Sequence, residues 1–445
     1  MKAIIIGAGK TGYNLAKILA NERHNVVVIE KAEERAKIID EYLDVKVLVG
    51  NGASAAILEE AGVQKAGLLI AVTASDEVNI IACMVAKTYG AGKTVARIRN
   101  PEYFDRDKKM RKAFPGIDLM INPEFVTARE IMKLIDASEA LNVEYYAEGK
   151  IQLLELRIKE DAPVVNKYLN ELKFDYSFLI IAILRNEKLI IPSGCDQILA
   201  NDIIFLLGKT EEMIHLERLF GIERVKAQRI MVLGGGYTGY YLAKMLEGRN
   251  YSVKIIEKEY NRCVDIAQNL KNALVLYGDA MDIDFLTNED VGNTDVFVSL
   301  SGDDRLNIVV SLLVKQLGVK RTIVEVGHSD FINFIENAGV DIGISPRVLT
   351  ANAILRYIHK GDNILSVTLL SNESAEMAEF IVSEKSAVAH KKLCELQLPA
   401  GALIGSIYRD NEVIIPHGDD ELKPGDIVTL FTLPNAVRAL DYLTE

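Results

Sequence analysis

Residues 3–12 read AIIIGAGKTG, an apolar run that leads directly into a GxGxxG loop. Residues 230–239 read IMVLGGGYTG and repeat the pattern, offset by 227 positions. In each copy a second apolar run ends in an acid 18 residues after the last glycine, at Glu30 and at Glu257. A strand, loop, helix, strand and acid in this spacing are typical of a dinucleotide-binding βαβ unit. Two copies of the whole unit predict two Rossmann-like domains in one chain.

The three glycines of each loop have different expected roles. The first makes a tight turn, the second lets the backbone approach a pyrophosphate, and the third lets helix and strand pack closely. The amides of the following helix then face the phosphates. Glu30 and Glu257 are expected to accept hydrogen bonds from adenosine ribose hydroxyls, and they would repel a 2′-phosphate. The loops therefore favour NAD or ATP over NADP.

The composition excludes several other classes of protein. The 445 residues allow several domains, and the net charge of −12, with Lys and Arg interspersed among acids, argues against a nucleic-acid partner. No apolar stretch approaches the roughly 18 residues of a membrane span, and no secretion signal precedes the first predicted strand, so we expect a soluble protein. The 4 cysteines form no CxxC pair and the 6 histidines form no HxxxH or HExxH pattern. This predicts buried, reduced thiols and no metal site.

Short apolar runs alternate with amphipathic stretches after each loop, as in a doubly wound parallel sheet. The two series end near Ile121 and Ile344. A proline then opens a predicted long helix, with Asn122 and Ser345 as expected N-caps. Beyond each helix lies a β-rich stretch with an Ile-Ile-Pro phrase, which indicates a small α+β domain.

We therefore predict an α/β chain built as a tandem of two halves. Each half holds a Rossmann-like domain with a doubly wound parallel sheet, a connecting helix and a small α+β domain, and a linker lies near residues 221–228. The predicted limits are 1–121, 122–140 and 141–223 for the first half, and 228–344, 345–361 and 362–445 for the second.

Ligands of open parallel sheets bind at the carboxyl ends of the strands. Asn51 and Asp279 follow the third strand of each copy, where they could bond the adenine edge or cap the next helix. Thr73 and Ala74 follow the fourth strand, and their small size would let a nucleotide lie across the sheet edge. Asp76 opens the next helix, where its charge could instead complement the helix dipole.

The two copies diverge on the fifth strand. Arg97 and Arg99 stand in the first copy where Glu325 and Gly327 stand in the second. Strand alternation places both arginines on one face, which suits phosphate binding, with a surface ion pair to the helix acids as the alternative. The second site should therefore bind a less phosphate-rich or more weakly held ligand. Gly235, at the variable position of the second loop, is expected to make that loop floppier.

No proton-transfer group, Walker loop or nucleophile elbow accompanies these loops, so we predict no catalytic residue and favour a sensor over a dehydrogenase. The candidate nucleotide-binding residues are Gly7, Ala8, Gly9, Lys10, Thr11, Gly12, Glu30, Asn51, Gly52, Thr73, Ala74, Asp76, Arg97, Arg99, Gly234, Gly235, Gly236, Tyr237, Thr238, Gly239, Glu257, Asp279 and Ala280.

These motifs resemble the regulator-of-potassium-conductance (RCK) family, also called KTN. The resemblance covers essentially the whole chain and rests on the GAGKTG loop, Glu30, the segments AVTASDE (71–77) and ARIRNPEY (96–103), and small domains similar to RCK-C modules. It implies a cytoplasmic regulator, peripheral at the inner face of the cell membrane, that gates a Trk-type potassium channel or transporter subunit in response to NAD(H) or ATP/ADP. It also implies a homo-oligomeric ring, a dimer or tetramer of this two-repeat chain. In some members the RCK-C modules bind cyclic dinucleotides or ions, and no set of residues in this sequence decides whether its two modules do.

Two other functions compete with this interpretation. An NAD-dependent oxidoreductase would show substrate-dependent NADH formation, and a regulator of a soluble partner would not co-purify with a membrane subunit. In the favoured hypothesis the long helices after Pro123 and Pro346 act as levers, and their apolar faces are expected to pack against another nucleotide domain.

Overall fold

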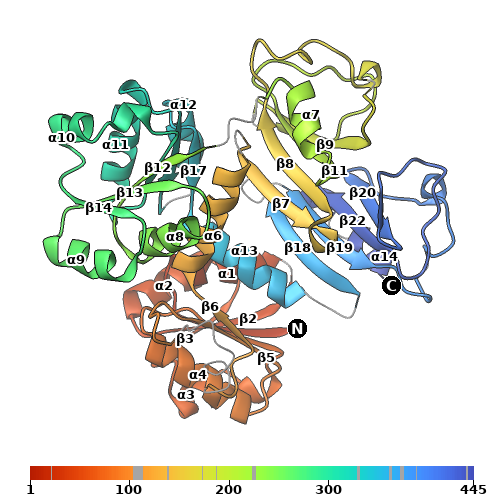
Figure 1. The fold of residues 1–445 in the computed structure, drawn as a ribbon. Helices are drawn as coiled ribbons and strands as arrows, with labels where there is room; N and C mark the ends of the chain where they lie inside the picture. Colours follow the sequence, from red (N-terminus) through yellow and green to blue (C-terminus); the bar gives the residue numbers. More distant parts are fainter. Residues whose placement is uncertain are drawn as a thin grey trace.

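The computed structural model describes residues 1–445 except 22, 104–113, 138–139, 173, 187, 223–226, 328–330, 360–362, 371–374, 387, 437–438 and 445. Parts of the predicted linker at 221–228 and the ends of both predicted connecting-helix segments lie outside the described residues. Figure 1 shows two Rossmann-like domains, which we term the nucleotide domains after their predicted ligand, and two small domains, with the two connecting helices side by side at the centre.

The first nucleotide domain is a parallel sheet in the strand order β3-β2-β1-β4-β5-β6 within the described part. This order reverses between β1 and β4, so the glycine loop after β1 lies at the topological switch point where ligands of such sheets bind. Its elements are β1 Lys2–Ile6, α1 Lys10–Asn21, β2 Asn25–Glu30, α2 Glu33–Tyr42, β3 Lys46–Val49, α3 Ala55–Glu60, η1 Val63–Lys65, β4 Leu68–Ala71, α4 Asp76–Thr88, β5 Lys93–Arg97 and β6 Leu119–Ile121.

The second nucleotide domain repeats this topology in the order β14-β13-β12-β15-β16-β17. The predicted doubly wound sheets are therefore confirmed, with strand ends that differ from expectation by a residue or so. Its elements are β12 Arg229–Leu233, α8 Tyr237–Glu247, β13 Ser252–Glu257, α9 Tyr260–Asn269, β14 Leu274–Tyr277, α10 Ile283–Asn288, η4 Val291–Asn293, β15 Val296–Ser299, α11 Asp304–Gln316, β16 Arg321–Glu325, α12 Ile332–Asn337 and β17 Ile342–Ile344.

Each connecting helix packs into the nucleotide domain of the other half of the chain. Helix α6 (Pro123–Asp136) buries Ile131 and Ile135 in the core of the second nucleotide domain, and α13 (Pro346–His359) buries Ile354 and Leu355 in the core of the first. Arg321 on β16 donates hydrogen bonds to the carbonyl oxygen of Leu134 in the last turn of α6 and to that of Ala140, beyond the end of the helix. The expectation that each helix packs against another nucleotide domain is confirmed, and that domain belongs to the other half of the same chain.

The two predicted caps of these helices differ. Asn122 Oδ1 accepts a hydrogen bond from Phe125 N at 2.7 Å, and its Nδ2 donates to Arg99 O at 3.1 Å. The side-chain cap predicted at Ser345 is wrong, because its buried hydroxyl has no hydrogen-bond partner among the described residues. The Asn122 side chain has an NH₂ group that holds its orientation while the oxygen caps the helix, whereas the Ser345 side chain has only one short hydroxyl group.

Each small domain is an antiparallel sheet of the same topology, β10-β9-β11-β8-β7 and β18-β19-β22-β20-β21 in the described residues. The two sheets face each other through a shared core that includes Phe205 and Leu207 from one and Met377 and Phe431 from the other. The elements are β7 Asn142–Tyr146, η2 Ala147–Gly149, β8 Ile151–Arg157, η3 Leu169–Glu171, β9 Phe178–Arg185, β10 Lys188–Ile190, β11 Ile203–Lys209 and α7 Met213–Leu219, then β18 Ile364–Leu370, β19 Ala375–Ile381, η6 Leu393–Glu395, β20 Ala402–Arg409, β21 Glu412–Ile414, β22 Ile427–Thr432, η7 Pro434–Ala436 and α14 Ala439–Thr444.

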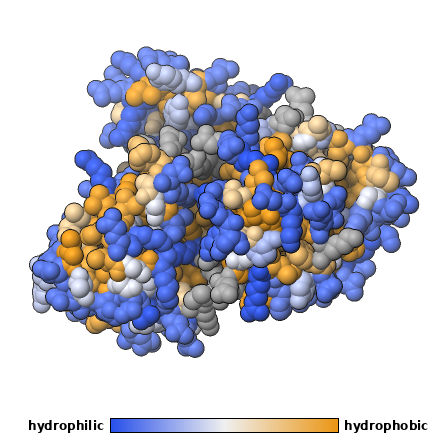
Figure 2. Space-filling view, turned by 90° about the horizontal axis from the view of Figure 1, so that it is seen from above, coloured by the Kyte–Doolittle hydropathy of each residue, from blue (hydrophilic) through white to orange (hydrophobic). Residues whose placement is uncertain are grey.

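The expectation that all four thiols are buried is wrong for two of them. Cys83 and Cys263 are buried, but Cys195 and Cys394 are exposed, because they lie in loop and 3₁₀ segments of the small domains rather than in a core. Among the described helices, none is long and apolar enough to cross a membrane. The face in Figure 2 is mostly hydrophilic, and its apolar atoms form separate patches rather than a continuous band.

Candidate functional site

A cavity of about 1070 Å³ lies where the two nucleotide domains and both connecting helices meet. In the described part of the chain, five helices begin at its wall: α1 at Lys10, α6 at Pro123, α8 at Tyr237, α11 at Asp304 and α13 at Pro346. A helix N-terminus presents N–H groups without intrahelical partners and carries partial positive charge. The wall of this cavity therefore favours anions such as phosphate.

The first and third glycines of both loops have the roles predicted for them. Gly7 and Gly234 have φ of +101° and +102°, a conformation that side chains disfavour. A Cβ on Gly12 would lie 1.9 Å from the Gly7 carbonyl oxygen, and one on Gly239 would lie 2.1 Å from that of Gly234. Loop and helix can pack this closely only with glycine.

The second glycine of each loop has open space beside it. A Cβ built on Gly9 or on Gly236 meets no atom within 4 Å. Both residues line the cavity. The protein's own packing therefore does not require glycine at these positions, whereas close approach of a pyrophosphate to the backbone would.

Gly235 is confined rather than floppy, which corrects the expectation for the second loop. Its amide donates to Glu257 Oε2 at 2.8 Å, and an added Cβ would lie 2.2 Å from Ile266 Cδ1. The packing of Ile266 against the loop explains this extra glycine.

The two acids at the ends of β2 and β13 bind their own loops. Glu30 accepts hydrogen bonds from Ala8 N at 2.5 Å and Ala32 N at 2.9 Å, and Glu257 makes the equivalent bonds to Gly235 and Glu259. A carboxylate has about four acceptor positions, so these bonds leave capacity for ribose hydroxyls. Glu30 lines the cavity and Glu257 does not.

Asn51 and Asp279 hold turns rather than cap the following helices. Asn51 Oδ1 accepts from Ala53 N at 3.1 Å, and Asp279 Oδ1 accepts from Met281 N at 2.9 Å. The N-caps of α3 and α10 are other residues, three positions further along in each case. Capping was therefore the wrong alternative for both residues, because the turn separates them from the helix.

Asp76 lies outside the described cavity wall and binds the backbone of the segment that carries Arg99. Its carboxylate accepts hydrogen bonds from Arg99 N at 2.9 Å and Asn100 N at 2.7 Å. It is absent from the cavity wall as described. These bonds also redirect the backbone after β5, which ends at Arg97, so strand alternation does not extend to Arg99.

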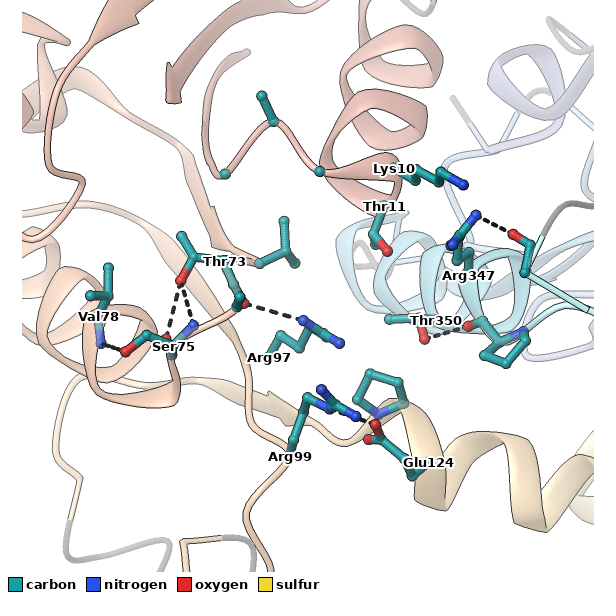
Figure 3. Close-up of a pocket in the computed structure, with 18 of the residues that line it drawn as sticks. Lys10, Thr11, Thr73, Ser75, Val78, Arg97, Arg99, Glu124, Arg347 and Thr350 are labelled. Carbon is teal, nitrogen blue, oxygen red and sulfur yellow. Dashed lines mark hydrogen bonds and ion pairs between the residues drawn. The ribbon is translucent and has the colours of Figure 1, made fainter. Parts of the chain in front are cut away.

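The two arginines nevertheless both line the cavity, in different environments. Arg97 donates to Thr73 O at 3.2 Å and forms no ion pair within the described residues, and burial together with Arg99 lowers its pKa. Arg99 is half exposed and pairs with Glu124 at 2.6 Å (Figure 3). The environment of Arg97 is therefore compatible with phosphate binding. Arg99 instead forms the surface ion pair that the sequence offered as the alternative to phosphate binding.

Sequence reasoning left two kinds of site residue out of its candidate set. Asn79 is fully buried, accepts from Thr73 N at 2.9 Å and donates to Arg97 O at 2.8 Å, so it joins the ends of β4 and β5. Asn307 makes the same bonds in the second half. Their repetition at an equivalent place in both copies was the available signal.

Arg347 is the second kind of missed residue. It lies in the first turn of α13, lines the cavity and donates to the Gly327 carbonyl oxygen. Figure 3 shows its head close to the Lys10 side chain of the other half. The signal was the paired phrase Pro123-Glu124 and Pro346-Arg347, in which the charge is reversed.

Glu325 occupies the position equivalent to Arg97. Its Oε2 is buried and has no hydrogen-bond partner in the described structure. Burial, Glu124 and Asp304 raise its pKa to about 8, with Arg99 acting in the opposite direction. At neutral pH this carboxyl group is therefore mostly protonated, so it repels phosphate less than a carboxylate would.

We expect Glu325→Gln to raise the thermal unfolding midpoint at pH 9 and to leave it nearly unchanged at pH 5. A carboxyl whose pKa is higher in the folded state than in the unfolded state costs stability as pH rises from its ordinary value to about 8, and glutamine removes that cost. Melting curves at pH 5, 7 and 9 measure the effect. Glu412→Gln, at an exposed position on β21, is the control. Equal shifts at every pH would contradict this assignment.

The cavity thus gathers all but two of the candidates from the first half, and from the second half only three residues of the glycine loop. The candidates on its wall are Gly7, Ala8, Gly9, Lys10, Thr11, Glu30, Asn51, Gly52, Thr73, Ala74, Arg97, Arg99, Gly236, Tyr237 and Thr238. Those absent from its described wall are Gly12, Asp76, Gly234, Gly235, Gly239, Glu257, Asp279 and Ala280.

Two Rossmann-type domains at one shared cavity, each followed by a small antiparallel domain, define a tandem protein of the RCK class. The TrkA-N domain family matches residues 3–123 and 230–346, and the TrkA-C domain family matches residues 153–221 and 377–443. The chain belongs to the TrkA family of Trk system potassium uptake proteins.

Relatives match along the whole length. Trk system potassium uptake protein TrkA homolog 1 of Methanosarcina mazei is 41% identical, with 99% of each chain covered. Trk system potassium uptake protein TrkA of Haemophilus influenzae is 34% identical, with 97% of this chain and 95% of the relative covered.

Solved structures share the fold. The GsuK channel bound to NAD has a TM-score of 0.63 at 20% identity and covers 99% of this chain and 78% of its own. The crystal structure of the GsuK RCK domain also has a TM-score of 0.63 at 20% identity, covering 99% of this chain and 94% of its own.

Proposed function

We propose that this chain is a nucleotide-sensing subunit that binds NAD(H) or ATP/ADP in the shared cavity and thereby gates a Trk-type potassium-transporting membrane subunit. The observation that carries the proposal is the open space beside Gly9, in a cavity that also holds Arg97 and five helix N-termini in the described structure. This combination suits a phosphate chain close to the backbone.

In the proposed complex the first half supplies most of the contacts. The loop around Gly9 and the start of α1 would bind the pyrophosphate, Glu30 would accept bonds from the ribose, and Arg97 would bind a phosphate oxygen. Asn51 and Gly52 line the same cavity and would lie near the adenine. Asn79 would position this set by holding Thr73 and the end of β5.

The family favours this function over the alternatives. The relatives are named potassium uptake proteins, and the GsuK structure that shares the fold is described as a channel bound to NAD. We propose that the chain assembles into a homo-oligomeric ring and acts at the inner face of the membrane through its partner. The nucleotide would bias two arrangements of the ring, as far as its affinity for them differs.

Binding is tested by calorimetric titration of the purified chain with ATP, ADP, NAD, NADH and a cyclic dinucleotide. We expect Arg97→Ala to weaken the preferred nucleotide about 10- to 150-fold, the loss typical of a hydrogen bond to a charged group. Arg305→Ala removes an exposed arginine outside the described wall and should change nothing. Equal affinity of Arg97→Ala and wild type would contradict the site.

Gating is tested in proteoliposomes that contain the membrane subunit. Potassium flux should differ between ADP and ATP with the wild-type chain, and Arg97→Ala should reduce that difference. If the difference persists in full, Arg97 does not distinguish the phosphates. Co-purification with a soluble protein but never with the membrane subunit would favour the regulator of a soluble partner.

A further inference from the structure

Positive side chains from both halves converge in the cavity. Lys10 comes from the first glycine loop, Arg97 from β5 and Arg347 from the first turn of α13 (Figure 3). Burial, followed by the charge of Arg347, lowers the pKa of Lys10, and Asp304 acts in the opposite direction. Lys10 is exposed and Asp304 acts on both cations, which reduces their mutual repulsion without removing it, and a bound anion between them would reduce it further.

Arg347 has little compensation of its own charge. Its guanidinium donates to the backbone oxygen of Gly327, and no described acid forms an ion pair with it. Burial lowers its pKa, although Asp304 lies near enough to act in the opposite direction. Asp304 itself accepts from Gly327 N at 2.9 Å. An arginine held in this way can bind a phosphate without first breaking a salt bridge.

We infer that Arg347 binds the terminal phosphate of the nucleotide whose pyrophosphate lies on the first glycine loop, so that one ligand joins the two halves of the chain. The inference rests on the proposed function. It makes Arg347, from the second half, the residue that distinguishes a triphosphate from a diphosphate at the first site.

Helix α13 links this contact to the small domains. Arg356 follows Arg347 by nine residues, about 13 Å along the helix. Its Nη2 donates to Glu144 Oε1 at 2.7 Å, and Glu144 lies on β7 of the first small domain. A phosphate that moves the start of α13 would therefore also shift Arg356 and change its ion pair with the buried Glu144 of the small domain.

The experiment compares ATP and ADP affinities of the wild type, Arg347→Ala, Arg347→Lys and Arg305→Ala by calorimetry. We expect Arg347→Ala to weaken ATP about 10- to 150-fold and ADP about 3-fold or less, because ADP lacks the terminal phosphate. Arg347→Lys keeps a point charge but not the guanidinium fork, so its loss should be smaller. Arg305→Ala should match the wild type.

The outcomes separate this inference from the proposed function. Equal losses for ATP and ADP, or no loss for either, overturn the role of Arg347 while leaving the binding site in place. A wild-type chain that binds NAD(H) but neither ATP nor ADP overturns the role of Arg347 alone, and a chain that binds none of these nucleotides overturns both. Melting curves show whether each variant is folded, and Arg347→Gln replaces the alanine variant if alanine destabilises α13.

Discussion

Replacing Glu144 with alanine should lower the free energy of unfolding by about 3 kcal/mol. Glu144 is 6% exposed and accepts hydrogen bonds from Arg356 at 2.7 Å and Lys133 at 3.4 Å. Its removal would leave two cations without their shared carboxylate, and Arg356 Nε is already buried without a partner in the described structure. The estimate is at the lower end of the range for buried pairs because 31% of the Arg356 side chain remains exposed.

Acid should weaken the same cluster. Burial alone would raise the pKa of Glu144, but Arg356 and Lys133 outweigh it and hold the pKa below its ordinary value. The stability that this pair contributes is therefore complete above the ordinary glutamate pKa, and it is lost as the pH falls through the lower pKa of the folded state. Its neighbour Glu130 differs, because burial raises its pKa.

Denaturant unfolding of Glu144→Ala and wild type at pH 7 measures the effect. Asp419→Ala is the matched control, since Asp419 is 94% exposed and its pair with Lys392 spans 3.5 Å at the surface. That change should stay within about 0.5 kcal/mol of wild type. A Glu144→Ala variant as stable as the control would show that the cluster does not hold α6, α13 and β7 together.

Replacing Gly9 with alanine should weaken nucleotide binding without unfolding the chain. An added Cβ meets no protein atom within 4 Å, so the thermal midpoint should not move. It would occupy the space that we assign to the pyrophosphate, and overpacking of about 1–3 kcal/mol corresponds to a loss of affinity of about 5- to 150-fold.

Two matched variants sharpen this test. Gly12→Ala places its Cβ 1.9 Å from a backbone oxygen and should unfold or distort the loop. Gly236→Ala makes the equivalent change at the second loop and should weaken binding less, because Glu257 and Asp279 lie off the described cavity wall. Full affinity in Gly9→Ala would show that no ligand approaches the first loop.

The sequence predicted what depends on local patterns. Apolar runs, glycine spacing and the Asn122 cap identified both nucleotide domains and the start of α6, because such signals act within a few residues. The pairing of domains is different. That α6 completes the second core and α13 the first depends on contacts between residues far apart in the chain, such as Ile131 with the sheet that begins at β12.

Separation along the chain also explains why part of the site was not predicted from the sequence. Arg347 gains its significance from Lys10, more than 300 residues earlier, and nothing in its neighbourhood of the sequence indicates that contact. Glu325 was interpreted from its charge, but burial beside Glu124 and Asp304 decides whether it carries one at neutral pH. Burial and long-range neighbours of this kind follow from tertiary packing and not from residue type.

The exchange of connecting helices has a consequence for how the two halves can diverge. In a dimer of identical chains joined in this way, every substitution would occur on both sides of the two-fold axis. Here both partners belong to one polypeptide, so Arg97 can face a cavity whose other side carries Glu325, and Glu124 can correspond to Arg347. Covalent joining of the halves thus permits an asymmetric cavity that no symmetric pair of subunits could build. Glu124 and Arg347 place opposite charges at equivalent positions, and a mostly protonated Glu325 stands where the other half has Arg97.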